Sequence, residues 1–141
     1  MRDILFRGKR IDNNEWIYGN LLVIEDECFI ITVSRKDWKK IQLEKIEVNP
    51  DTVGQYTGLK DKNGTKIFEG DIVKYHTESI SFKRDTIGVV EYYNGTFGIV
   101  TDKGKHFLSF HNMSAYVRCI EVIGNIYDNP ELLEVEDAKN S

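Results

Sequence analysis

The side chains best suited to chemistry are concentrated in GQYTGLKDKNGTKIFEGDIV, which spans residues 54–73. This stretch mixes glycines, carboxylates and lysines between apolar runs. Such a composition suits a phosphate loop, a metal loop, a catalytic carboxylate pair or a tight β-hairpin. These four interpretations place different demands on residue spacing, so the spacing can be tested against each.

The spacing fits neither of the two ion-binding loops. A phosphate loop of the Walker type needs Gly-x4-Gly-Lys-Ser/Thr, but five residues separate Gly58 from Gly64 and a threonine precedes the lysine. A calcium loop that began at Asp61 would need glutamate at its twelfth position, where Ile72 stands. We therefore expect no phosphate or calcium site in this stretch.

The carboxylates of Glu69 and Asp71 form the remaining catalytic candidate. Residues two apart share one face of a regular strand, and paired carboxylates can divide acid and base roles in a suitable pocket. The competing interpretation is that Gly70 bends the chain and leaves both carboxylates in solvent. The neighbouring lysines favour this second interpretation, a salt-bridged hairpin.

Other chemically reactive residues form no recognisable motif. His106 and His111 are five apart, so on one regular strand they would face opposite ways. Cys28 and Cys119 lie in apolar runs and are predicted to be small buried side chains without a disulfide. The sequence contains no GxSxG element and no CxxC pair. We expect no catalytic residue, no metal site and no cofactor, and hence no enzyme.

The elements that must position these residues are short strands separated by turns rich in Gly, Asn and Asp. Asn94-Gly95 is a favoured hairpin pair, and Asn49-Pro50 should end a strand. Residues 34–40 have the spacing of one helical turn but are too short and too polar to predict one, whereas Asn129-Pro130-Glu131 predicts a short helix over ELLEVE. No strand–helix alternation occurs, so the pattern predicts a mainly β chain, an antiparallel barrel or sandwich.

Length and charge narrow the classes of function. A chain of 141 residues suits one domain, or one domain with a small lobe. The formal net charge of −4 disfavours a general grip on nucleic-acid backbones, although a local basic patch remains compatible. The charged N-terminus lacks the apolar core of a signal peptide, and no apolar window is long enough for a membrane helix. A cytoplasmic protein is expected.

Aromatic side chains are the last candidates for a binding surface. We expect most of them to fill the core of a small barrel, although exposed aromatics on such barrels can stack bases or hold peptides. Because Tyr92 and Tyr93 are adjacent, a strand must direct them to opposite faces, and at least one should be exposed. The set consists of Tyr56, Phe68, Tyr75, Tyr92, Tyr93 and Phe97.

Three blocks of the sequence resemble the signature blocks of the YopX family of phage and prophage proteins. They are GQYTGLKDKNG (54–64), IFEGDIV (67–73) and VIGNIYDNPELL (122–133), in the family's order. RDILFRGKR (2–10) and the Trp16-Ile-Tyr18-Gly19 segment are similar to its N-terminal hairpin. The resemblance runs from about residue 2 to residue 134, and Phe68 stands where the family often has tyrosine.

The resemblance implies a fold and a setting, but no activity. It implies a mainly β protein with an SH3-type small barrel in the C-terminal half and a β-hairpin N-terminal region. The short antiparallel strands and the short C-terminal helix are expected from the residues themselves. We expect an N-terminal β region packed on the barrel over 1–50, the barrel and helix over 51–135, and a frayed tail over 136–141. The family has no established activity, so no catalytic residue is carried over.

Three hypotheses follow for the function. The first is a non-catalytic binding or assembly module of a phage or prophage in a bacterial cytoplasm, with a protein partner or self-association. The second is a nucleic-acid-binding barrel that uses aromatics and basic residues such as Lys36, Lys39, Lys40, Lys83 and Arg84. The third is a cryptic enzyme that uses Glu69 or Asp71. The candidate partner-binding residues are Tyr56, Lys60, Asp61, Glu69, Asp71, Tyr92 and Tyr93.

Overall fold

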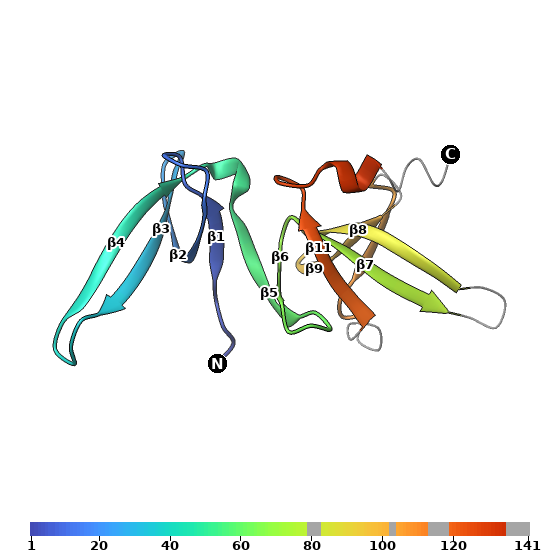
Figure 1. The fold of residues 1–141 in the computed structure, drawn as a ribbon, viewed down its shortest axis with the longest axis horizontal. Helices are drawn as coiled ribbons and strands as arrows, with labels where there is room; N and C mark the ends of the chain where they lie inside the picture. Colours follow the sequence, from blue (N-terminus) through green and yellow to red (C-terminus); the bar gives the residue numbers. More distant parts are fainter. Residues whose placement is uncertain (79–82, 102–103, 113–118, 135–141) are drawn as a thin grey trace. The chain divides into compact units, whose positions relative to one another are not determined.

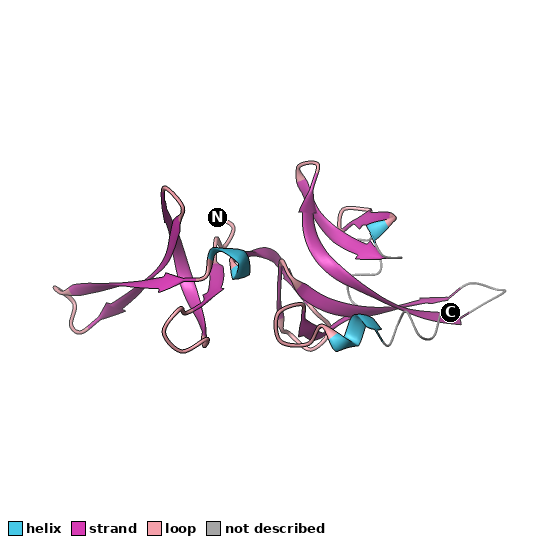
Figure 2. Cartoon of the chain, turned by 90° about the horizontal axis from the view of Figure 1, so that it is seen from above, coloured by secondary structure: helices cyan, strands magenta, loops and turns pink. Residues whose placement is uncertain are grey.

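Antiparallel strands make up most of the described chain, which confirms the predicted mainly β class (Figures 1 and 2). A computed structural model of the protein describes residues 1–78, 83–101, 104–112 and 119–134. The chain divides into two units, Met1–Tyr56 and Thr57–Ser141. The pairing of the described strands defines two sheets and no closed barrel, so the SH3-type closure stays an expectation.

The first unit is a strand meander whose neighbours in sequence are neighbours in space. Its strands pair in the order β4-β3-β2-β1, and the beginning of β5 pairs with β1 through Phe6 and Arg7. Val48 is fully buried, and its side chain lies so close to Gly8 that a Cβ there would meet Cγ2 at 2.9 Å. The elements are β1 (Phe6–Lys9), β2 (Trp16–Ile24), β3 (Glu27–Arg35), β4 (Ile41–Val48), the 3-10 turn η1 (Pro50–Thr52) and β5 (Gly54–Lys60).

Asn49-Pro50 ends β4 as predicted, and η1 connects the strand to β5. The Asn49 side chain accepts a hydrogen bond from the amide of Asp51, and the Thr52 hydroxyl accepts one from the amide of Lys9. Residues 34–40, whose spacing is that of one helical turn, form no helix, because β3 continues to Arg35 and a turn follows. The Asp37 carboxylate accepts the amides of Lys39 and Lys40 in the turn between β3 and β4.

The second unit packs a hairpin onto a five-stranded sheet with the order β10-β9-β8-β7-β11. Its core includes Ile67 of the hairpin and Val73, Val90, Ile99 and Ile120 of the sheet. The core residues within a strand alternate, as Val73 and Tyr75 do in β7. The strands are the end of β5, β6 (Lys66–Phe68), β7 (Asp71–Glu78), β8 (Lys83–Tyr93), β9 (Thr96–Thr101), β10 (His106–Ser109) and β11 (Ile120–Asn125).

The second unit contains the hairpin turn and the helix start that the sequence predicts. Asn94 and Gly95 have φ values of 53° and 84° and join β8 to β9, which confirms the predicted hairpin. A helix begins after Pro130 and is described over residues 131–134. The rest of the predicted helix, residues 135 and 136, and the predicted tail lie outside the described residues. No helix in the described part of the chain is long and apolar enough to cross a membrane.

Candidate binding surfaces

The Asp61 carboxylate is the organising group of the turn between β5 and β6. It is 7% exposed, and its Oδ1 accepts the amides of Asn63 at 2.8 Å and Thr65 at 2.9 Å. Its Oδ2 accepts the amide of Val122 in β11 at 2.9 Å. The carboxylate therefore serves three backbone donors, one of them 61 residues away in the sequence.

These hydrogen bonds also determine the charge state of Asp61. Burial by itself raises the pKa of the carboxyl group. The amides of Val122, Thr65 and Asn63, together with the Lys62 ammonium, stabilise the charged form and hold the pKa below its ordinary value. A carboxylate kept charged and occupied by backbone donors is a structural anchor, and it has the wrong protonation for a general acid.

At the Gly70-Asp71 turn, the prediction that the carboxylates of Glu69 and Asp71 are both in solvent is wrong. Asp71 is 2% exposed, and its Oδ2 accepts the amide of Phe68 at 2.7 Å, whereas Glu69 is half-buried. Gly70 has a φ of 88°, and the ring of Tyr127 lies where a Cβ would point, at 3.0 Å. Because Gly70 reverses the chain, Glu69 and Asp71 do not lie on one regular strand face, and the premise of the carboxylate pair fails.

Asp71→Ala is expected to lower the free energy of unfolding by about 2 kcal/mol, because it removes a buried hydrogen bond and leaves the Phe68 amide buried without that acceptor. Asp71→Asn keeps an acceptor oxygen and should lose about half as much. Urea denaturation followed by far-UV circular dichroism measures both values. Equal stability of wild type and Asp71→Ala would show that the bond contributes nothing.

The exposed aromatic candidates lie at the β8–β9 hairpin. Tyr92 is 57% exposed and Tyr93 is 61% exposed, which confirms that at least one is accessible. Tyr92 pairs with Phe97, and their rings meet edge to face with centroids 5.0 Å apart. Tyr93 meets Phe107 of β10 edge to face at 5.2 Å. Both tyrosines are therefore held in place by a second aromatic ring while most of each side chain faces solvent.

The Phe107 ring is seated on a glycine. A Cβ on Gly98 would lie 2.6 Å from Cζ of Phe107 and 2.5 Å from the carbonyl oxygen of Leu108. The absence of a side chain at Gly98 lets the ring lie close against β9, where Tyr93 packs beside it. Tyr92 and Tyr93 lie on opposite faces of β8, Tyr92 beside Phe97 and Tyr93 beside Phe107. We call Tyr92, Tyr93 and Phe107, which together surround this end of the hairpin, the aromatic rim of the second unit.

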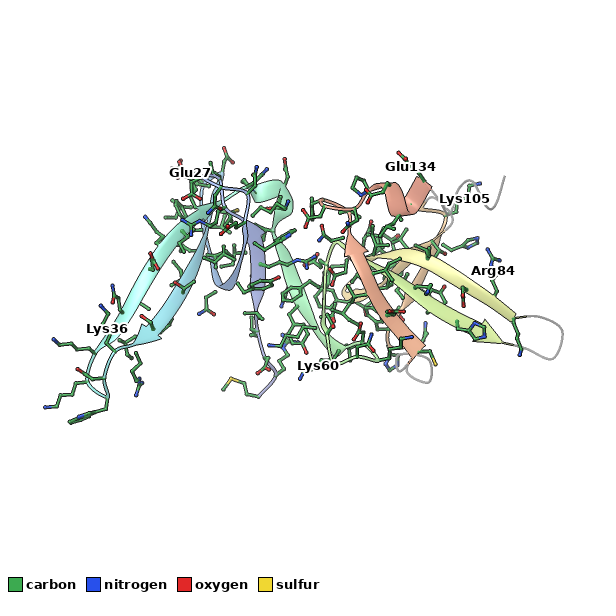
Figure 3. All side chains as sticks on the ribbon, in the orientation of Figure 1. Glu27, Lys36, Lys60, Arg84, Lys105 and Glu134 are labelled. Atoms are coloured by element: carbon green, nitrogen blue, oxygen red, sulfur yellow. The ribbon has the colours of Figure 1, made fainter. Side chains whose placement is uncertain are left out.

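The other candidate residues are divided between core and surface. Tyr56 is buried, and burial together with the nearby Asp3 carboxylate raises the pKa of its hydroxyl. Lys60 is exposed at the end of β5 (Figure 3). Tyr92 and Tyr93 are neighbours at the β8–β9 hairpin but lie on opposite faces of β8, and Asp61 and Asp71 serve separate turns, so the structure brings no two of these candidates onto one face.

Cysteines and metal ligands add no further site to the described chain. Cys28 and Cys119 are both free thiols, as predicted. Cys119 is exposed, so its predicted burial is wrong; it comes just before β11 and lies outside the strand alternation that buries Ile120. Among the described residues, no three His, Cys, Asp or Glu side chains gather in a way that could hold a metal ion.

Comparison with known proteins identifies the family. The YopX protein family matches residues 5–134, which is nearly the whole chain. The chain belongs to the YopX family. It is also similar to a solved structure, protein EF1440 from Enterococcus faecalis, at 27% identity and a TM-score of 0.58. That similarity covers 94% of this chain and 99% of the other. A search of curated proteins gives no match.

The three blocks that resemble the YopX signature meet in the second unit. Asp61 of the first block binds the Val122 amide of the third, and the Lys62 amide donates to Ile120 O at 2.9 Å. The Ile126 amide donates to Gly70 O of the second block, also at 2.9 Å. In this YopX chain the blocks are thus the framework of the second unit, and the carboxylates of Asp61 and Asp71 accept backbone amides.

Sequence reasoning missed two residues that the structure places on exposed surfaces of this YopX chain. Phe107 belongs to the aromatic rim, and only the pairing of β10 with β9 places it beside Tyr93. Trp38 is 78% exposed in the turn between β3 and β4. The sequence could have indicated an exposed position for Trp38, because this residue lies among cations in RKDWKK.

Proposed function

We propose that this YopX chain is a non-catalytic binding or assembly module of a phage or prophage, acting in the cytoplasm of the bacterial host. Its second unit closes as an SH3-type small barrel and presents the aromatic rim to a protein partner or to a second copy of the chain. The observation that carries this proposal is the rim itself: two exposed tyrosines braced by Phe97 and Phe107.

The chemistry of the rim supports recognition of a protein surface. Tyrosine supplies a large contact area with few rotatable bonds, and its hydroxyl can form a hydrogen bond at the edge of an interface. Tyrosines are enriched among the residues that dominate binding energies. Because the rings of Phe97 and Phe107 already limit the motion of Tyr92 and Tyr93, these tyrosines lose little conformational entropy on binding.

The carboxylates support a non-catalytic role. Asp61 and Asp71 each accept backbone amides, and a general base must have an oxygen within reach of its substrate proton. The Oδ2 atom of Asp71 is engaged by the Phe68 amide inside the unit, where the side chain is 2% exposed. We therefore propose a scaffold role for both residues.

Tyr92→Ser/Tyr93→Ser is expected to weaken binding of the protein partner by roughly 30-fold, the effect of a loss of about 2 kcal/mol at a hot spot. The measurement is capture on the tagged full chain from infected or prophage-induced cells, followed by titration of the captured protein. Tyr18→Ser, which changes an exposed tyrosine of the first unit, is the matched control and should retain the partner.

Self-association is separated from partner binding by light scattering over a range of protein concentrations. A concentration-dependent dimer that is lost in the tyrosine double variant assigns the rim to a second copy of the chain. Full retention of both partner and dimer by a correctly folded double variant would overturn the proposal for the rim.

A further inference from the structure

The hairpin of β3 and β4 extends beyond the rest of its sheet as a two-stranded ribbon. β2 pairs with β3 only from Glu27 to Ile31, while β4 accompanies β3 up to the Arg35–Ile41 pair. Residues 32–35 and 41–44 thus pair only with each other among the described strands (Figure 1). Four residues at about 3.3 Å each give a projection of roughly 13 Å before the turn. We call residues 32–44 the arm.

The tip of the arm concentrates positive charge in a chain that is acidic as a whole. Residues 35–41 contain four cations and one carboxylate, a formal net charge of +3, against −4 for the whole chain. None of the four cations forms an ion pair with a described residue. Figure 3 shows Lys36 pointing outward from the tip. The four cations are Arg35, Lys36, Lys39 and Lys40.

The nearest carboxylate on the paired strands outside the tip, Glu44, is three residues from Ile41 along β4, about 10 Å, and offsets at most one of the four positive charges. The next acidic cluster is farther away. Glu25, Asp26 and Glu27 lie at the opposite end of β3 from Arg35. Eight residue steps along a strand span about 27 Å, whereas the Debye length is about 10 Å at 0.1 M salt. Asp37 is the one carboxylate at the tip, and its Oδ1 accepts the Lys39 and Lys40 amides. The arm therefore presents a positive end to any approaching ligand.

One face of the arm also exposes apolar side chains that nothing in its own unit covers. Val33 pairs with Leu43, and Arg35 pairs with Ile41, so all four share a face. Val33, Leu43 and Ile41 are each more than half exposed. At the tip, Trp38 lies under the ammonium of Lys39, which is 4.6 Å from the centroid of its ring.

We propose that the arm binds duplex DNA by entering the major groove. A two-stranded β-ribbon is one of the two elements that fit this groove, which is about 12 Å wide and 8.5 Å deep. The projection of the arm exceeds that depth. The lysines of the tip neutralise phosphates, while Arg35 can donate to guanine and the apolar residues beside it contact thymine methyl groups.

Duplex DNA fits the arm better than the two other anionic partners. Single strands are bound by grooves with successive stacking rings, but the arm has Trp38 as its single aromatic ring and is a two-stranded ribbon. A membrane surface would favour a continuous apolar face, but Arg35 interrupts the apolar residues of the arm. The proposal concerns the first unit and is independent of the aromatic rim of the second.

The test measures binding of the full chain to a labelled mixed-sequence duplex of about two helical turns by fluorescence anisotropy. With three phosphate contacts, the affinity should fall roughly 40-fold between about 50 and 200 mM salt. Lys36→Gln/Lys39→Gln should bind more weakly at low salt, and its affinity should fall only about 4-fold over the same range. Both substitutions are in exposed positions, and circular dichroism confirms that the variant is folded.

Lys60→Gln/Lys105→Gln is the control, because it removes two exposed charges from the second unit and leaves the arm unchanged (Figure 3). It should retain the wild-type salt dependence. Absence of duplex binding at low salt would overturn the proposal, and so would an equal loss in both double variants. Tighter binding of single strands that is lost in Trp38→Ala, or arm-dependent binding of phosphatidylserine vesicles without duplex binding, would also overturn it.

Discussion

Asp61→Ala is expected to lower the free energy of unfolding by about 4 kcal/mol, the largest effect of a single polar substitution in the second unit. A hydrogen bond to a charged group contributes about 1.5–3 kcal/mol, and the three bonds of Asp61 share one acceptor and so do not add fully. The substitution also leaves the amides of Asn63, Thr65 and Val122 without this acceptor.

Hydrogen exchange of these three amides makes the test specific. In Asp61→Ala, exchange at Asn63, Thr65 and Val122 should accelerate well beyond the change expected from the loss of global stability. Both tryptophans, Trp16 and Trp38, lie in the first unit, so tryptophan emission monitors that unit separately. Unchanged exchange at all three amides would contradict the assigned role of Asp61.

The contribution of Asp61 to the free energy of unfolding is expected to depend on pH, and Asp61→Asn tests this. The folded state lowers the pKa of Asp61, so its stabilising contribution is fully present above the unfolded pKa of about 3.9. The contribution is lost as the pH falls through the lower, folded pKa. Wild type should thus be more stable than Asp61→Asn at neutral pH, and the difference should shrink below about pH 4. Denaturation curves over pH 2–7 measure it, and a constant difference would contradict the prediction.

Gly98→Ala is expected to destabilise the second unit by about 3 kcal/mol and to displace Phe107 from the aromatic rim. The added Cβ would lie 2.5 Å from a backbone carbonyl oxygen of β10, and that oxygen cannot move without shifting the strand. Thermal denaturation measures the loss, and the aromatic ring signals of Tyr93 in NMR spectra report the displacement.

Gly58→Ala is the matched control for this clash. Gly58 has a φ of 87° but open space where its Cβ would point, so alanine there carries only the conformational cost of about 1 kcal/mol. If Gly98→Ala proved no more destabilising than Gly58→Ala, the close packing of Phe107 on β9 would not be a source of stability.

Features determined by neighbouring residues were predictable from the sequence. Asn94-Gly95 adopts positive φ values at little cost and is flanked by alternating strands, so the β8–β9 hairpin follows from local preferences alone. Pro50 lacks an amide donor and ends β4 for an equally local reason. The family was also predictable from the sequence, because the YopX blocks are recognisable without the strand pairing.

Features that depend on distant partners were not predictable. The third acceptor bond of Asp61 needs Val122, and no local spacing indicates that pair. Asp71 was expected in solvent because a turn residue with a charge is usually exposed, yet it caps the Phe68 amide inside the unit. The Phe107–Tyr93 contact depends on which strand neighbours β9, so the aromatic rim could not be assembled from sequence alone.

The bond between Asp61 and Val122 has a consequence for synthesis on the ribosome. The strands β1 to β4 of the first unit pair with near neighbours in the sequence, so that unit can form while the rest is still being made. The second unit must wait until β11 emerges, because Ile120–Asn125 pairs with β7 and supplies the Val122 amide. Until then Asp61 lacks its distant donor, and a truncated chain that ends before β11 would carry a finished first unit beside an unfinished second one.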